Sequence, residues 1–300
     1  MKQRTALLSV ASNSALILIK VIAGTLTGSV AILTEAVHSS VDLIASLVAF
    51  VSVRIADEPA DDTHRYGHEK VENLAAAFEA ILILVGSLAI AFEAVRRLVV
   101  GGSTHTLGLG IAVIGFSAVA NTIVSVVIAR GGRLTDSPAL LGDAAHLRTD
   151  AVSSFVVLIA LILVQATGAQ WIDPVAALLV ALAIVFTGLR LLIRAGEVLV
   201  DQALPADEIA VIAQVIEGFS DRGVIGYHEL RTRRGGSQRY VDLHIQFRKG
   251  TSLEDAHHTA HQLQDRIAET LGGADVLIHL EPEDRVRPGH RLASSFRGSR

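Results

Sequence analysis

Two histidine–aspartate pairs with the same spacing lie in an otherwise apolar part of the sequence. His38 and Asp42 belong to the stretch TEAVHSSVD, and His146 and Asp150 belong to DAAHLRTD. Because residues four apart project from one helix face, each pair presents an imidazole and a carboxylate together. Two such faces turned toward each other would supply the nitrogen and oxygen donors that tetrahedral Zn²⁺ accepts. One pair alone could equally be a buried, hydrogen-bonded structural pair, but its repetition favours a metal site.

A second group of possible ligands lies in the charged segment after the first of these pairs. Asp61, His64 and His68 could converge on one metal ion, since Gly67 permits a tight turn that folds the segment back. An ordinary solvent-exposed loop is the alternative interpretation.

The third group lies near the C-terminus. His228 and His244 fall on two expected strands, and His279 and Glu281 fall on a third, where alternate residues share a face. With a histidine from a neighbouring helix, these side chains could build one or two metal sites. Surface histidines without a ligand are the alternative.

Long apolar segments must position the first two pairs. Of the 300 residues, 51% are hydrophobic and 19% are charged, and the mean hydropathy is +0.49. We expect six membrane-spanning helices, each with roughly the 20 residues needed to cross a bilayer core. They are expected over 5–26, 30–53, 73–95, 107–129, 139–167 and 172–189.

Ionisable residues inside such segments are costly and often functional. We expect Lys20 to snorkel toward the membrane surface and Asp143 to lie at a solvated helix end. Glu79 is isolated in the third segment, where we expect it to satisfy a helix contact, with proton carriage as the alternative.

The distribution of lysine and arginine predicts that both termini are cytoplasmic. The turns 27–29 and 168–171 carry neither residue, whereas the N-terminus and the connections on the other side carry several. Arg96 and Arg97, at the outer end of the third segment, oppose this orientation but are outnumbered.

After about residue 205 the chain reads as a polar α+β domain. The expected elements are a helix over 206–219, strands over 224–233 and 239–248, a helix over 252–271 and a strand over 275–281. The order α-β-β-α-β predicts a ferredoxin-like or related fold.

We therefore predict three parts: a six-helix transmembrane domain (1–204), a cytoplasmic domain for metal binding and dimerisation (205–284), and a disordered polar tail (285–300).

Composition excludes several classes of protein. The chain has no cysteine, and its only methionine is Met1, so disulfide scaffolds and soft sulfur metal sites are excluded. A net charge of −4 gives no indication of nucleic-acid binding. The zinc-protease motif HExxH is absent from the sequence, and we do not expect an enzyme.

In this order, the motifs resemble those of the cation diffusion facilitators, the proton-coupled exporters of divalent metals. The resemblance covers about residues 5–284 and rests on GSVAILTEAVHSSVDL, PADDTHRYGHEK, the second HxxxD, LVDQALP, HELRTR and VLIHLEP. The chain is most similar to the bacterial iron/zinc efflux facilitators, which have a cytoplasmic metallochaperone-like domain.

The resemblance implies three metal sites and a homodimer joined mainly through the cytoplasmic domains. The implied ligands are His38, Asp42, His146 and Asp150 in the transport site, Asp61, His64 and His68 in the loop, and His228, His244, His257, His279 and Glu281 in the cytoplasmic site.

Two residues depart from the pattern of the iron/zinc facilitators. His38 stands where those proteins have aspartate, and within the family a histidine there accompanies a preference for zinc. We therefore favour Zn²⁺ as substrate, with Cd²⁺, Fe²⁺ or Mn²⁺ as alternatives. Glu281 stands where the cytoplasmic site usually has aspartate.

The expected function is Zn²⁺/H⁺ antiport across the inner cell membrane, with the bilayer, divalent metal ions and protons as partners. Metal and protons compete for the same lone pairs, and histidine titrates near physiological pH, so exchange follows from linkage. Zinc bound to the cytoplasmic domains would regulate transport through a coupling between two sites. The alternatives are a membrane metal sensor or scaffold that does not transport, and a membrane metalloenzyme.

Overall fold

Residues 2–27, 30–100, 109–169, 171–283 and 294–295 are described by a computed structural model of the chain. Within it the chain divides into two units, Met1–Glu197 and Val198–Arg300, which are described separately. The predicted boundaries at 204/205 and 284/285 stay predictions, and most of the predicted tail lies outside the described residues.

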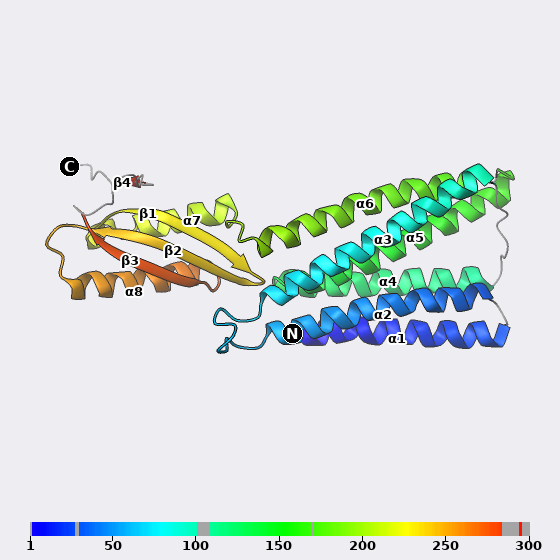
Figure 1. Cartoon of the computed structure of the whole chain (residues 1–300), viewed down its shortest axis with the longest axis horizontal. Helices are drawn as coiled ribbons and strands as arrows, with labels where there is room; N and C mark the ends of the chain where they lie inside the picture. Colours follow the sequence, from blue (N-terminus) through cyan, green and yellow to red (C-terminus); the bar gives the residue numbers. More distant parts are fainter. Residues whose placement is uncertain (1, 28–29, 101–108, 170, 284–293, 296–300) are drawn as a thin grey trace. The chain divides into compact units, whose positions relative to one another are not determined.

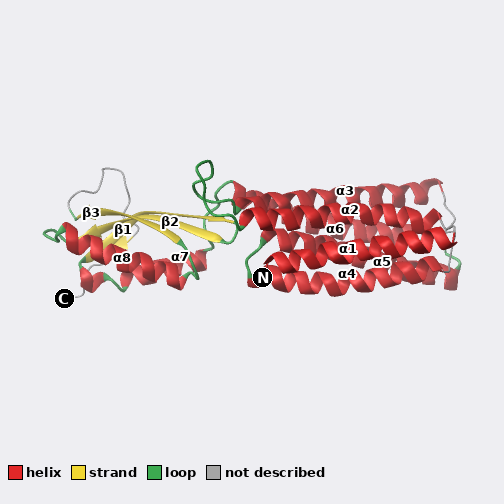
Figure 2. Ribbon diagram, turned by 90° about the horizontal axis from the view of Figure 1, so that it is seen from below, coloured by secondary structure: helices red, strands yellow, loops and turns green. Residues whose placement is uncertain are grey.

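Over the described residues, the first unit consists of six long helices (Figures 1 and 2). They are α1 (Lys2–Thr27), α2 (Val30–Ala56), α3 (Lys70–Val100), α4 (Leu109–Leu134), α5 (Pro138–Thr167) and α6 (Ile172–Leu199). Five of them, all except α2, contain described stretches that are long and apolar enough to cross a membrane. Many side chains in the first half of α2 lie outside the described residues, so the sixth span stays a prediction.

The helices pack through small residues. α1 contacts α2 and α4, and α5 contacts α2, α3 and α4. Ala45, Ala49 and Ala80 are fully buried between helices, whereas large apolar side chains such as Leu88 and Phe92 face outward. This distribution is typical of membrane helices, because small residues allow close backbone approach while lipid accepts the large apolar ones.

Local signals define the two ends of α5, which carries the second histidine–aspartate pair. The side chain of Ser137 accepts a hydrogen bond from the backbone N–H of Leu140, and Pro138 follows it in the first turn. At the other end Gly168 is left-handed, with φ of 73°, and its N–H bonds to the carbonyl of Val164. Both ends of α5 are therefore determined by nearby sequence.

The second unit contains a small sheet and two longer helices (Figure 1). Its elements are α7 (Ala206–Glu217), the short 3₁₀ helix η1 (Ser220–Arg222), β1 (Val224–Gly235), β2 (Gln238–Phe247), α8 (Leu253–Thr270), β3 (Asp275–Pro282) and β4 (Ser294–Ser295). From α7 to β3 the helices and strands follow the predicted order, and Ser252 caps α8 as expected.

The sheet has the order β3-β2-β1-β4. β1 and β2 are antiparallel, and β2 and β3 are parallel. In the hydrophobic core of the second unit, sheet residues such as Val241 and Ile245 pack with Ile212, Ile216 and Leu263 of the helices. The periodic apolar residues of α7 and α8 therefore cover the sheet and fix the positions of its strands.

Candidate metal sites

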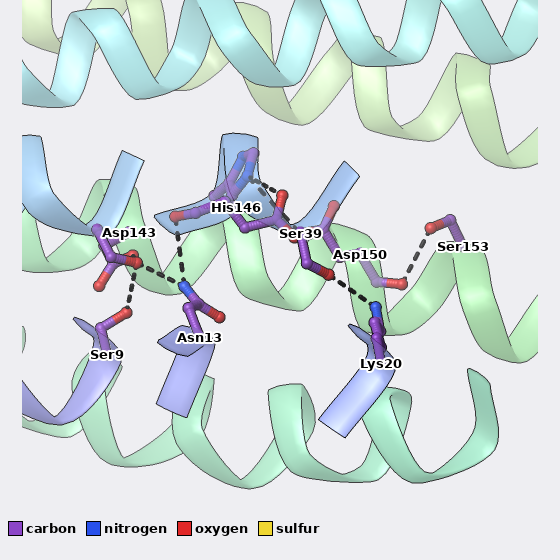
Figure 3. Close-up of polar contacts among 10 residues, drawn as sticks. Ser9, Asn13, Lys20, Ser39, Asp143, His146, Asp150 and Ser153 are labelled. Atoms are coloured by element: carbon purple, nitrogen blue, oxygen red, sulfur yellow. Dashed lines mark hydrogen bonds and ion pairs between the residues drawn. The ribbon is translucent and has the colours of Figure 1, made fainter. Parts of the chain in front are cut away.

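Asp42, His146 and Asp150, here called the bundle group, converge between α2 and α5. Figure 3 shows His146 and Asp150 on α5. Nε2 of His146 lies 3.4 Å from Oδ1 of Asp42 and 3.6 Å from Oδ2 of Asp150. One ligand atom from each residue lies within 4.8 Å of the other two. The i, i+4 spacing on α5 and the packing of α5 against α2 together place these three donors around one point.

The fourth predicted donor, His38, lies on α2 four residues before Asp42. Its side chain lies outside the described residues. The structure therefore brings together three of the four predicted donors of the transport site.

A buried polar network extends from the bundle group along α1, α2 and α5 (Figure 3). Asn13 donates to the carbonyl oxygen of Asp42 at 3.3 Å and to Oγ of Ser46 at 2.6 Å. Ser46 in turn donates to Oδ1 of Asp143 at 3.1 Å and shares a hydrogen bond with Ser9. Asp143 is fully buried, so the expectation of a solvated position was wrong. Sequence reasoning missed its burial because that depends on how α1 and α2 cover α5.

Lys20 does not snorkel in this structure. Only 3% of the residue is exposed, and its Nζ donates to Oγ of Ser39 at 2.7 Å. The ammonium group therefore lies inside the helical unit, within one turn of Asp42 along α2. The expectation was wrong because a polar partner on α2 makes the buried position available.

Asp61, His64 and His68, the loop group, lie between α2 and α3. Asp61 contacts His68 at 3.4 Å and His64 at 3.7 Å, and the two imidazole rings lie 4.6 Å apart between centroids. Gly67 adopts a φ of +83°, which glycine tolerates far better than other residues, and so allows the predicted turn.

Hydrogen bonds within the loop hold Asp61 in place. Its Oδ1 accepts from the N–H of His64 at 2.6 Å, the N–H of Thr63 at 2.7 Å and the hydroxyl of Thr63 at 2.8 Å. The bond from the backbone of His64 is the main reason that the pKa of Asp61 falls to about 2. The carboxylate is therefore ionised and oriented at neutral pH.

His228, His244 and Glu281, the sheet group, meet across three strands. His228 is opposite His244 in the β1–β2 pair, and β3 lies beside β2. Nε2 of His228 lies 2.8 Å from Oε2 of Glu281, and Nδ1 of His244 lies 3.0 Å from its Oε1. Strand register therefore brings these three side chains to one face.

The contacts within the sheet group affect the charge of Glu281. Partial burial opposes ionisation, but the hydrogen bonds to His228 and His244 outweigh it and lower the pKa of Glu281. The geometry thus presents an ionised carboxylate between two imidazoles, a donor set suited to a divalent metal.

Sequence reasoning missed Glu229, whose Oε2 lies 3.3 Å from Nε2 of His244. Glu229 has a positive φ of 49°, and the β1–β2 register shifts between His228 and Arg231. This β-bulge redirects the side chain of Glu229 toward the group. Its position directly after His228 was the available signal, but strand alternation assigned it to the other face.

The two remaining predicted cytoplasmic ligands lie differently. His279 is largely exposed, 3.8 Å from Glu281, with its ring centroid 4.6 Å from that of His244. His257 lies on α8, where its ring centroid is 4.4 Å from that of His261. Among the described residues, His257 does not share a metal-sized group with the other predicted ligands, so its role stays a prediction.

Two family models match this chain. The cation efflux transmembrane domain matches residues 6–200, and the cytoplasmic domain of cation efflux proteins, named for dimerisation, matches residues 204–283.

Two related proteins match over nearly the whole chain, and one solved structure matches over a smaller part. The uncharacterized transporter sll1263 of Synechocystis sp. is 34% identical over 92% of this chain and 89% of its own length. The cation-efflux pump FieF of Salmonella newport is 34% identical over 93% of this chain and 92% of its own length. A solved structure of CzrB in its zinc form is 34% identical over 29% of this chain and 99% of that chain, with a TM-score of 0.27.

Proposed function

This chain belongs to the cation efflux family, the cation diffusion facilitators, and we propose that it exports Zn²⁺ in exchange for protons. As a family member it is a secondary transporter of divalent metal rather than an enzyme, with membrane helices and a cytoplasmic dimerisation domain. Our proposal adds three points to this family assignment: zinc is the substrate, transport is coupled to protons, and the residues named below bind both.

The convergence of Asp42, His146 and Asp150 carries this proposal. These three side chains are largely buried in a helical unit whose outer surface is apolar. Burying ionisable groups there costs free energy, and such groups are typically kept for a function. With His38 as the fourth donor, the site would offer two imidazoles and two carboxylates. That donor set suits tetrahedral Zn²⁺ better than it suits Mn²⁺, which prefers an oxygen-rich site.

Proton coupling follows from the chemistry of the same donors. A metal ion and a proton bind the same imidazole nitrogens and carboxylate oxygens, so binding of one displaces the other. We infer that Zn²⁺ binds from the cytoplasm, that the helices then open to the other side, and that protons from that side displace the metal.

The cytoplasmic domain serves as the regulatory part of this proposal. Zn²⁺ bound by His228, His244 and Glu281, with His279 and His257 as further ligands, would tighten a homodimer and bias the membrane helices. The loop group would hold a further ion. We also propose that the cytoplasmic domain has a ferredoxin-like fold. The membrane domain would have six spans in the inner membrane, with both termini in the cytoplasm.

Zinc flux into vesicles tests the proposed function. Purified protein is placed in liposomes with a zinc-sensitive dye inside and a pH gradient across the membrane. We expect the wild type to move Zn²⁺, and Asp42→Ala and Asp150→Ala to move little. Asp57→Ala is the matched control, because Asp57 is exposed and bonds Gln3 at 3.1 Å instead of facing the bundle group.

The same assay separates transport from metal sensing. A sensor or scaffold needs only the sheet group, so it would bind zinc without moving it. Absence of wild-type flux, or equal flux by the two aspartate variants and the control, would refute the transport proposal.

A further inference from the structure

Glu79, on α3, is a buried carboxylate to which the proposed metal site assigns no role. The residue is fully buried, and neither of its Oε atoms has a hydrogen-bond partner among the described residues. An ionised carboxylate without a partner is strongly unfavourable inside a bilayer. Glu79 therefore requires either a proton or a nearby positive charge.

Close helix packing places Glu79 against α5, about one helical turn from His146 of the bundle group. A Cβ atom built on Gly142 of α5 would lie 3.3 Å from both Cβ and Cγ of Glu79, and 3.2 Å from Cα of Ala76. Gly142 precedes His146 by four residues, about one helical turn. The stem of Glu79 thus lies against α5 where a glycine allows the two helices to approach.

The charged groups that act on Glu79 come from the two helices that contain the bundle group. They are Asp143, His146 and Asp150 of α5, and Asp42 of α2. Three of the four are carboxylates, whose charge would repel a further negative charge on Glu79, whereas a protonated His146 would attract it. A divalent cation bound by Asp42, His146 and Asp150 would reverse that local field and favour an ionised Glu79.

We propose that Glu79 is a proton-coupling residue, protonated while the bundle group holds no metal and ionised while it holds Zn²⁺. This inference rests on the proposed Zn²⁺/H⁺ exchange and adds to it a proton site that does not touch the metal. When Zn²⁺ binds from the cytoplasm, the O–H bond of Glu79 breaks and its proton passes to cytoplasmic water. After Zn²⁺ leaves on the other side, a proton from that side re-forms the bond.

Proton release on zinc binding tests this inference in the full-length protein. Zn²⁺ is titrated into detergent-solubilised protein in buffers of different ionisation enthalpy, and the calorimetric heats give the protons released per Zn²⁺. By linkage, we expect Glu79→Gln to release about one proton fewer for each Zn²⁺ bound in the bundle group. Vesicle measurements of proton and zinc flux should give a correspondingly lower H⁺/Zn²⁺ ratio.

Glu93→Gln is the matched control. Glu93 lies on the same helix, but its side chain is about half exposed and pairs with Arg96 and Arg97. We expect this variant to release the wild-type number of protons. A merely structural role for Glu79 would change stability or zinc affinity and leave the proton count unchanged.

Proton release by Glu79→Gln equal to that of the wild type would overturn the inference. If Glu79→Gln does not fold, Glu79→Asp provides the test, since it keeps a carboxyl group on a side chain that is shorter by one methylene. A shifted pH dependence of zinc-linked proton release supports the inference, and an unshifted one overturns it. Lack of wild-type exchange refutes the proposed function, whereas wild-type exchange with an unchanged variant ratio refutes only the role of Glu79.

Discussion

Nη1 of Arg97, at the end of α3, lies 3.2 Å from Oδ2 of Asp173, in the first turn of α6. Nε of the same guanidinium lies 2.9 Å from Oε1 of Glu93. Counting cationic residues treats Arg97 as evidence against cytoplasmic termini. The rule counts lysine and arginine and not net charge, so Arg97 still counts against that orientation, while its two carboxylate contacts join the end of α3 to the start of α6.

The Arg97–Asp173 pair should stabilise the packing of α3 with α6. Arg97→Met leaves the carboxylate of Asp173 largely buried without this partner, whereas the arginine itself is about half exposed. We expect a loss of about 1 kcal/mol in stability, between the values for exposed and buried pairs. Thermal unfolding of the detergent-solubilised protein measures it.

Arg96→Met is the control for that substitution. Arg96 is mostly exposed and pairs with Glu93 on its own helix, at 3.0 Å. Its removal should change the unfolding temperature little. Equal effects of the two substitutions would show that the contact with Asp173 contributes nothing specific.

Gly142→Ala should disturb the contact between α5 and α3. The added methyl group would lie 3.2 Å from the backbone Cα of Ala76, closer than ordinary van der Waals contact. Overpacking of this kind costs about 1–3 kcal/mol, and we also expect slower zinc flux because the helix that carries His146 would shift. Unfolding temperature and vesicle flux measure the two effects.

Gly86→Ala provides the matched glycine control. Gly86 lies on α3, and a Cβ atom there would have no described neighbour within 4 Å. Alanine in a helix interior is more stable than glycine by about 0.5–1 kcal/mol. Gly86→Ala should therefore keep or raise stability, and a loss as large as that of Gly142→Ala would contradict the packing argument.

Spacing along one helix or strand was the most informative signal in the sequence. The i, i+4 pair on α5 and the alternate positions on β3 predicted which side chains share a face, since these periods are local. Contacts that depend on packing between elements were not predictable in the same way. Asp143 is buried because α1 and α2 cover it, and Glu229 reaches His244 because a bulge interrupts β1.

Acid should loosen the loop that contains Asp61. The folded pKa of about 2 lies below the ordinary value of 3.8, so the ionised carboxylate stabilises the loop above pH 3.8 and loses this effect as pH falls toward 2. We expect the amides of Thr63 and His64 to stay protected at pH 5 and to lose protection toward pH 2, relative to their intrinsic exchange. Hydrogen exchange read by mass spectrometry measures this.

Asp61→Ala is the comparison for the acid effect. Without the three accepted hydrogen bonds, Thr63 and His64 should exchange rapidly throughout this pH range. Protection that survives in Asp61→Ala would mean that Gly67 and the backbone alone define the turn.

Glu281→Gln should weaken the sheet group at neutral pH. The pKa of Glu281 is lowered from 4.5, so its ionised form stabilises the fold above pH 4.5, and that contribution declines as pH falls below it. The variant should therefore be less stable than the wild type near pH 7, bind less zinc, and approach the wild type in acid. Unfolding curves at several pH values, with zinc titration at pH 7, test this.

Glu283→Gln is a suitable control for Glu281→Gln, because Glu283 is exposed and its side chain accepts from the backbone N–H of Lys249. A stability difference for Glu281→Gln that did not depend on pH would point to packing instead of charge.

His38→Asp should raise cadmium transport relative to zinc. His38 lies on α2 four residues before Asp42, where it would complete the bundle group. Replacing an imidazole by a carboxylate makes the donor set more anionic and less suited to tetrahedral Zn²⁺, so the larger Cd²⁺ ion should gain. Vesicle uptake of the two metals, expressed as a cadmium-to-zinc ratio, should rise several-fold, while His64→Asp in the exposed loop should leave it unchanged. An unchanged ratio in His38→Asp would remove the basis for a zinc preference set at this position.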